Sequence, residues 1–130
     1  MRVAIVGSRE CGSHIQRTRE ILFVLRAYPA GTVVISGGAI GIDGLAAKAA
    51  RALGLEVVEH LPEWNRLGRR AGFERNKAIV NDCDELHAWW DGKSRGTAHS
   101  IGLARAAGKL TIVHNIASAS LDGAGTGEGK

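Results

Sequence analysis

Short apolar runs alternate along the chain with longer segments in which apolar residues recur every three or four positions. Runs rich in Val, Ile or Leu predict buried strands, and the longer segments predict helices between them. The expected strands are Val3–Val6, Thr32–Ser36, Glu56–Glu59, Glu85–Trp89 and Leu110–His114, and the expected helices are Ser13–Arg26, Ile42–Leu53, Leu67–Asn81 and Arg95–Ala107. This alternation predicts an α/β domain in which a five-stranded parallel sheet lies between two layers of helices.

The helix ends carry residues that suit those positions. Ser13 is a candidate N-cap of the first helix, and Asp43 is either an N-cap of the second helix or a ligand for a ribose hydroxyl group. Gly54 and Gly108 can adopt the left-handed conformation that commonly ends a helix. We therefore place the ends of the second and fourth helices beside these two glycines.

Residues 115–130 differ in composition from the rest of the chain. Glycine occupies every second position from Gly123 to Gly129, and few large apolar residues accompany it. Such a segment cannot offset the entropy cost of ordering its backbone, so we expect a flexible tail. A chain of 130 residues has room for one domain, which we assign to residues 1–114.

The apolar runs are too short for a membrane span or a signal peptide, and this bears on the compartment that we expect. None approaches the ~18–20 residues of a membrane span, and Val3–Val6 is too short for the apolar region of a signal peptide. We expect a cytoplasmic protein with no membrane partner. Cys11 and Cys83 have neither the spacing of a metal clip nor that of a disulfide framework, so both are expected to be free thiols.

Charge adds a hint about the partner. Hydrophobic residues make up 45% of the chain, which suffices for a core and excludes wholesale disorder. The formal net charge is +4. A positive balance favours an anionic partner such as a nucleotide or a nucleic acid, or it simply keeps the protein soluble.

The loops that follow the strands are the place to look for a ligand site, because ligands of open parallel sheets bind beyond the carboxyl ends of the strands. The loops after the first, second and fourth expected strands are small, polar and rich in glycine. If the sheet is as expected, they meet at one edge. The candidate ligand-binding residues are Gly7, Ser8, Arg9, Ser36, Gly37, Gly38, Gly41, Asp43, Arg75, Asn76, Trp90, Gly92, Ser94, Gly96 and Thr97.

Two of these loops have the chemistry of phosphate binding. Glycines in Gly37-Gly38-x-x-Gly41 let the backbone approach an anion, and the amides of the following helix point at it. The spacing is not that of G-x-G-x-x-G or of a Walker motif, so no dinucleotide cofactor or Walker-type ATP use is expected. Ser94, Gly96 and Thr97 begin another helix in the same way. The alternative is a tight turn in the first loop and an ordinary helix cap in the second.

Other candidate groups have two interpretations each. Arg75 belongs to a segment, residues 65–77, with five cations and one acid, and it either binds a phosphate or lies on a solvated helix face. Trp89 and Trp90 point to opposite sides of a strand, so one packs in the core and the other either packs or stacks on a base. The histidines, including His99 one helical turn beyond the fourth loop, lack metal-ligand spacing, so no metal site is expected.

Four motifs together resemble the YspA-like, cpYpsA-related branch of the SLOG superfamily. They are Val6-Gly7-Ser8-Arg9, the Ser36-Gly37-Gly38 segment through Asp43 to Ala46, the segment from Pro62 and Trp64 to Arg75-Asn76, and Asp91-Gly92-x-Ser94-x-Gly96-Thr97. The resemblance covers nearly everything before the tail. It implies a Rossmann-like three-layer module that senses or processes a nucleotide-derived ligand, and it implies a homo-oligomer as a further expectation.

Two relatives with the same layout imply different activities. LOG-type phosphoribohydrolases carry a catalytic glutamate where this chain has Ser100, and a hydroxyl group is a poor substitute for a carboxylate in cleaving an N-glycosidic bond. The DNA-processing A (Smf) family has similar motifs at Gly7-Ser8-Arg9, Ser36–Asp43, Arg75-Asn76-Lys77 and Ser94–Thr97. That similarity implies binding of single-stranded DNA through its phosphates.

The sequence therefore predicts recognition of a small nucleotide-type ligand without a further cofactor and without turnover. The alternatives are single-stranded DNA binding and hydrolysis of a nucleoside monophosphate at its N-glycosidic bond.

Overall fold

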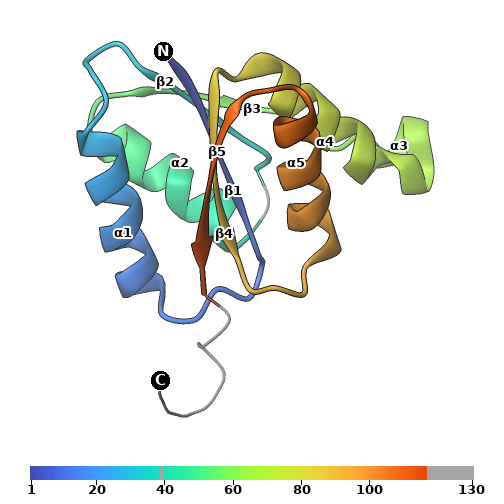
Figure 1. Ribbon diagram of the computed structural model, residues 1–130, viewed down its shortest axis with the longest axis horizontal. Coiled ribbons are helices and arrows are strands. Elements are labelled where there is room, and N and C mark those ends of the chain that lie inside the picture. Colours follow the sequence, from blue (N-terminus) through green and yellow to red (C-terminus); the bar gives the residue numbers. More distant parts are fainter. Residues whose placement is uncertain (39, 117–130) are drawn as a thin grey trace.

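The computed structural model describes residues 1–38 and 40–116, which fold into three layers with a parallel sheet in the middle (Figure 1). The sheet contains β1 (Arg2–Gly7), β2 (Val33–Ser36), β3 (Glu56–Glu59), β4 (Glu85–Trp90) and β5 (Leu110–Asn115). The helices are α1 (His14–Arg26), α2 (Ile42–Ala52), α3 (Trp64–Leu67), α4 (Ala71–Asp82) and α5 (Arg95–Ala106). The predicted five-stranded α/β architecture is confirmed.

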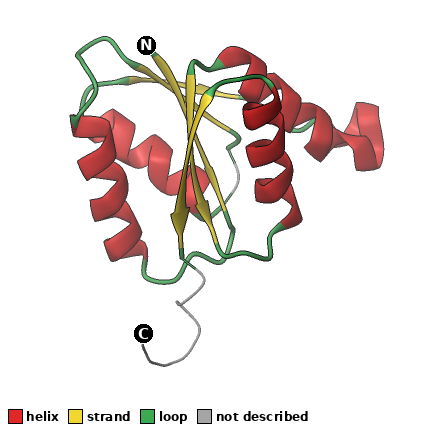
Figure 2. Ribbon diagram, viewed as in Figure 1, coloured by secondary structure: helices red, strands yellow, loops and turns green. Residues whose placement is uncertain are grey.

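The strand order is β3-β2-β1-β4-β5, and every pairing is parallel. Figure 2 shows α1 and α2 on one face of the sheet and α4 and α5 on the other. The chain moves outward from β1 to β3 and then returns to continue from β4 to β5. This reversal between β1 and β4 is the switch point of a Rossmann-like sheet, where loops diverge and leave a crevice.

Each face of the sheet has its own apolar core. On the α1–α2 side, Ile5, Ile21 and Trp89 belong to one buried cluster; on the α4–α5 side, Ile35 and Leu86 belong to another. Trp90 packs against the second cluster, so the two adjacent tryptophans point to opposite faces as predicted. Both faces are dry because parallel strands are covered by helices on both sides.

Most expected helix ends are confirmed. Ser13 Oγ accepts a hydrogen bond from the amide of Gln16 at 3.2 Å. Gly54 and Gly108 have positive φ angles of 74° and 71° after α2 and α5, respectively. The predicted N-cap at Asp43 is wrong, because Gly41 occupies the N-cap of α2 and Asp43 lies in the first turn.

The expected helix over Leu67–Asn81 is divided in the structure. A short α3 ends at Leu67, a 3-10 turn follows over Gly68–Arg70, and α4 begins at Ala71. Gly68 has a φ of 58°, which interrupts the helix at that point. Figure 1 shows α3 projecting away from the sheet. The break at Gly68 therefore gives α3 and α4 separate positions in the fold.

Two residues of the predicted tail belong to the described fold. β5 runs to Asn115, and Ile116 is only 5% exposed within the α1–α2 core cluster. The rest of the predicted tail, residues 117–130, lies outside the described residues, and so does Ala39 in the loop after β2. Within the described part of the chain, no helix is long and apolar enough to cross a membrane.

Candidate functional site

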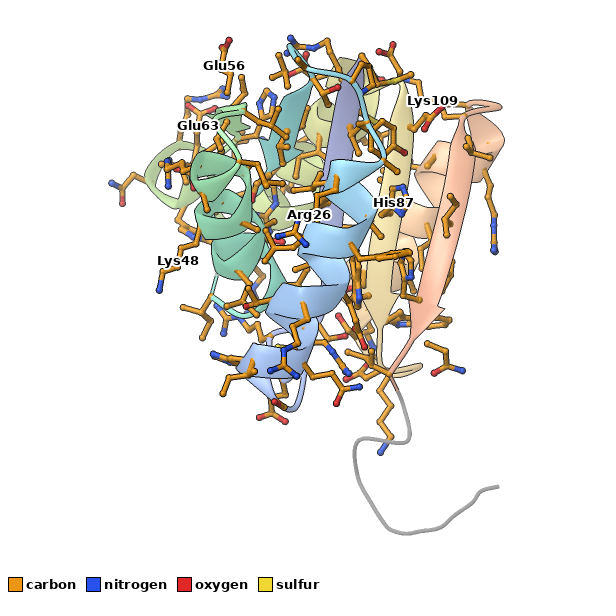
Figure 3. All side chains as sticks on the ribbon, turned by 90° about the vertical axis from the view of Figure 1, so that its left-hand side faces the viewer. Arg26, Lys48, Glu56, Glu63, His87 and Lys109 are labelled. Atoms are coloured by element: carbon orange, nitrogen blue, oxygen red, sulfur yellow. The ribbon has the colours of Figure 1, made fainter. Side chains whose placement is uncertain are left out.

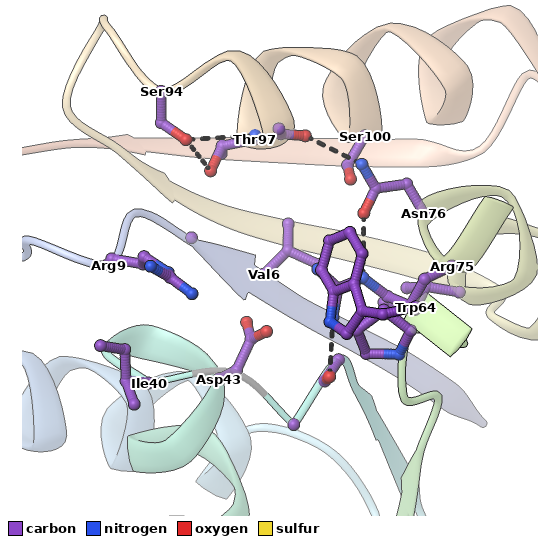
Figure 4. A pocket seen from close by; sticks show the side chains of 16 residues that line it. Val6, Arg9, Ile40, Asp43, Trp64, Arg75, Asn76, Ser94, Thr97 and Ser100 are labelled. Atoms are coloured by element: carbon purple, nitrogen blue, oxygen red, sulfur yellow. Dashed lines mark hydrogen bonds between the residues drawn. The ribbon is translucent and has the colours of Figure 1, made fainter. Parts of the chain in front are cut away.

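A cavity of about 560 Å³ opens at the carboxyl edge of the sheet, beside the reversal between β1 and β4. Loops after β1 and β2 form one side, and the facing ends of α4 and α5 form the other (Figure 4). Ten of the predicted ligand-binding residues line it: Gly7, Arg9, Gly37, Gly38, Asp43, Arg75, Asn76, Ser94, Gly96 and Thr97. Segments from distant parts of the chain are thus brought to one cavity.

Gly37 lies between two charged side chains on the β2 side of the cavity. The Nη1 atom of Arg75 donates to the Gly37 carbonyl oxygen at 2.7 Å. A Cβ atom on Gly37 would lie 2.5 Å from that Nη1 atom and 2.7 Å from Oδ2 of Asp43. Only glycine therefore allows the guanidinium group and the carboxylate group to approach the strand end together.

The N-terminus of α5 forms the opposite side. Ser94 is the N-cap, and its Oγ atom accepts from the Thr97 amide at 3.3 Å and lies 3.0 Å from the Thr97 hydroxyl oxygen. An added Cβ on Gly96 would meet nothing within 4 Å, so the helix presents open space at this position. Backbone amides and hydroxyl groups at a helix N-terminus favour an anion.

Asn76 connects the two sides. Its Oδ1 atom accepts from Nε of Arg75 at 3.2 Å, and its Nδ2 atom donates to the Gly96 carbonyl oxygen at 3.3 Å. The Nδ2 atom also lies 3.2 Å from Nδ1 of His99, whose ring meets Phe73 edge to face. The buried Asn76 side chain therefore fixes the guanidinium group of Arg75 relative to the start of α5.

The remaining predicted residues shape the loops and do not line the cavity. Ser36 Oγ donates to the Asp43 carbonyl oxygen and accepts from the Gly38 amide. A Cβ on Gly41 would lie 2.5 Å from the Arg9 carbonyl oxygen, so this glycine permits close packing of two loops. Ser8, Trp90 and Gly92 position the loop after β4.

The loop after β4 is organised around Asp91. Its carboxylate accepts from the amides of Lys93 and Ser94, both at 2.8 Å, and its amide donates to Ser8 Oγ at 3.2 Å. Burial alone would raise the pKa of Asp91, but these amide hydrogen bonds hold the pKa below its usual value. Trp90 Nε1 donates to the Ser94 carbonyl oxygen at 3.0 Å. These bonds, with a positive φ of 81° at Gly92, fix the start of α5.

Several lining residues were missed at the sequence level, and Trp64 is the most prominent. The Trp64 side chain is 58% exposed and stands over the cavity beside Arg75 (Figure 4). Trp90 does not line the cavity. Ser100 lines the cavity from α5 and is 2% exposed. The sequence contains features that indicate both residues. Trp64 follows a strand end, and Ser100 is four residues after Gly96, on the same face of the helix. Ile40 and Pro62 also line the cavity.

The charged side chains that line the cavity within the described chain are Arg9, Arg75 and Asp43. Two permanent cations against one carboxylate, together with the positive end of α5, favour an anionic ligand. No group of three or more potential metal ligands occurs among residues 1–38 and 40–116. The two buried cysteines, Cys11 and Cys83, are free thiols as predicted and lie outside the cavity lining.

Residues 1–67 match the YspA, cpYpsA-related SLOG family. The chain is also similar to the Gene 61 protein of Mycobacterium phage D29, with 34% identity over 113 residues that cover 82% of this chain and 90% of the phage protein. The similarity therefore covers most of both chains.

Two solved structures share the fold. DNA processing protein A (DprA) from Streptococcus pneumoniae gives a TM-score of 0.73 at 22% identity, over 86% of this chain and 49% of that one. DNA processing protein A from Helicobacter pylori gives a TM-score of 0.70 at 22% identity, over 87% of this chain and 64% of that one. The single-stranded DNA binding mode of that protein has been described. This chain thus spans about half of the first protein and somewhat less than two thirds of the second.

Proposed function

Because the chain belongs to the YspA, cpYpsA-related SLOG family, we propose that it binds a small nucleotide-type ligand in the cavity at the carboxyl edge of the sheet. One observation carries the proposal: the glycine loop after β2 and the N-terminus of α5 face a common cavity that also receives Arg9 and Arg75. A volume of about 560 Å³ is in the range of small-ligand sites.

Each side of the cavity suits one part of a nucleotide. The phosphate group binds at the start of α5, where Gly96 and the Thr97 hydroxyl are, because a helix N-terminus favours an anion. Arg75 neutralises its charge from the α4 side, and Arg9 does so from the loop after β1. Asp43 is placed to accept a hydrogen bond from a ribose hydroxyl group. The exposed ring of Trp64, and not Trp90, is the surface on which a base stacks.

The proposed action is recognition without turnover. Hydrolysis of an N-glycosidic bond requires a carboxylate near the sugar, and the catalytic glutamate of LOG-type enzymes is replaced here by Ser100. Among the described lining residues, Asp43 is the only carboxylate. Its place beside Gly37 and Arg75 suits binding of hydroxyl groups. Chromatography of protein mixed with nucleotide should accordingly show no free base, and release of a base would favour the hydrolase.

Replacing Arg75 with alanine is expected to weaken binding of the best-bound of the four 5′-mononucleotides by about tenfold to a hundredfold. A charge-assisted hydrogen bond contributes about 1.5–3 kcal/mol, and Arg75 lines the cavity that contains the proposed phosphate position. Titration calorimetry measures the affinity. Lys77→Ala is the matched control, because Lys77 is an exposed cation on the same helix that pairs with Glu74 and does not line the cavity. Equal affinities for the two variants would contradict the assignment of Arg75.

Single-stranded DNA is the second candidate ligand, favoured by the fold shared with DNA processing protein A and by the exposed Trp64 beside Arg75. Bases of any sequence stack on aromatic rings, and arginines release counterions from phosphates. Anisotropy of a fluorescent oligothymidine should then rise on adding protein at low salt and fall steeply between about 50 and 200 mM salt. Absence of binding at low salt would remove this candidate.

A further inference from the structure

A second hollow, of about 500 Å³, lies beside the cavity and is far more polar in character. Its lining includes Arg66, Arg70 and Glu74, and it shares Arg75 with the first cavity. The glycine motifs at the sheet edge do not line this hollow, although His60 to Leu67 in its lining fall within the segment that matches the family. The arginine that is proposed to bind a phosphate in the first cavity thus also faces a second space.

The segment between β3 and α3 separates the two spaces. His60, Leu61 and Glu63 line the hollow, whereas Pro62 and Trp64, the first residue of α3, line the first cavity. The chain between β3 and α3 thus borders both spaces and leads to Trp64, whose side chain is exposed. A base that stacks on this ring lies in the first cavity, and Arg75 is the residue that borders both the cavity and the hollow.

The hollow contains cations with unused hydrogen-bonding groups. Arg66 is paired with Glu63 at 2.7 Å, but no hydrogen bond or ion pair engages Arg70 within the described chain. Arg75 uses Nη1 for the Gly37 carbonyl and Nε for Asn76, and its Nη2 atom makes no hydrogen bond to a described residue. Arg70 and Arg75 both line the hollow, so two guanidinium groups with unused donors border the same space.

We propose that the hollow is a second anion subsite, so that the ligand carries two phosphate groups separated by a nucleoside, as in a dinucleotide unit. This inference rests on the proposed nucleotide function of the first cavity. One phosphate binds at the start of α5, the base stacks on Trp64, and the second phosphate binds between Arg75 and Arg70. A mononucleotide fills only the first cavity and leaves Arg70 unused.

The test compares the best-bound 5′-mononucleotide with the 5′-phosphorylated dinucleotide of the same base by titration calorimetry. The wild-type protein should bind the dinucleotide at least about tenfold more tightly, because a second charge-assisted contact is made. Arg70→Gln should remove most of that advantage and leave mononucleotide affinity within about twofold. Arg69→Gln is the matched control: Arg69 is an exposed neighbour in the same 3-10 turn, has the same charge, and lines neither space.

The outcomes separate this inference from the proposal on which it rests. Mononucleotide binding with no gain for the dinucleotide overturns the second subsite and leaves the first cavity as proposed. A dinucleotide advantage that Arg69→Gln reduces as much as Arg70→Gln does reflects general positive charge, and it also overturns the subsite. If neither probe binds, both the proposed function and the second subsite fail.

Discussion

Replacing Gly96 with leucine is expected to reduce nucleotide affinity by about a hundredfold or more, on the order of 3 kcal/mol, while the protein stays folded. Gly96 lines the cavity at the proposed phosphate position, and a Cβ there meets no atom within 4 Å. A leucine side chain can therefore extend into the cavity without displacing protein atoms, and it occupies the space of the ligand. Titration calorimetry with the mononucleotide measures the loss.

A matched substitution is available in the same helix. Gly102 is exposed on α5, does not line the cavity, and also has open space at its Cβ position. Both Gly96→Leu and Gly102→Leu place a better helix former in α5, so both should keep or slightly raise the melting temperature. Only Gly96→Leu should lose the ligand. Unimpaired binding by a folded Gly96→Leu protein would show that the ligand lies elsewhere.

The free energy of unfolding is expected to fall by about 3 kcal/mol as the pH is lowered from 6.5 to 4, through His87. This histidine is 4% exposed on the face of β4 that α1 covers (Figure 3). Burial, and then the nearby His114, lower the pKa of His87 from 6.5 to about 4, against a smaller opposing effect of Glu85. The unfolded chain therefore takes up a proton over this range that the folded chain does not, and each pH unit costs about 1.4 kcal/mol.

The neutral state of His87 is held by a defined set of neighbours. Its Nε2 atom lies 2.9 Å from the Tyr28 hydroxyl, which donates to Glu85 at 2.7 Å, and its Nδ1 atom lies 3.0 Å from Nε2 of His114. The His114 ring stacks on Trp89 at 4.1 Å between centroids, and burial lowers the pKa of His114 as well. A proton on His87 would therefore enter a crowded cluster in which the His87 side chain itself is buried.

Urea unfolding at several pH values tests this expectation. The stability of His87→Gln should be lower than that of the wild type at pH 7.5 and should depend less on pH between 6.5 and 4. His14→Gln serves as the control, because His14 is exposed at the start of α1 and its removal should leave the wild-type profile. A wild-type stability that stays constant over this range would contradict the buried, neutral His87.

Much of the fold is encoded locally and was predictable. Runs such as Val3–Val6 read as strands because parallel strands are buried on both faces, and Ser13 and Gly108 mark helix ends because their preferences act within a few residues. The same reasoning placed the loops at Gly37 and Gly96 at one edge. In a parallel sheet, the carboxyl ends of the strands lie on the same side, and the structure brings both loops to one cavity.

The sequence did not indicate which of the predicted site residues line the cavity and which position the loops around it. Ser8, Trp90 and Gly92 belong to the motif after β1 and β4, but their contacts hold the loop instead of lining the cavity. Which member of a loop faces a ligand depends on side-chain packing between loops that are far apart in sequence. Hydrophobic periodicity carries no information on that choice.

The amino-acid sequence by itself determined the strands, the main helices, the parallel sheet and the edge at which the glycine loops meet, because near neighbours and burial on both faces decide these features. Only the tertiary structure decided that Gly68 would break the third helix, that Trp64 would stand over the cavity, and that Arg75 would reach the Gly37 carbonyl. The 38 positions between Gly37 and Arg75 leave no local signal of that contact. It arises because the packing of α4 against the sheet brings one helix start to the end of β2.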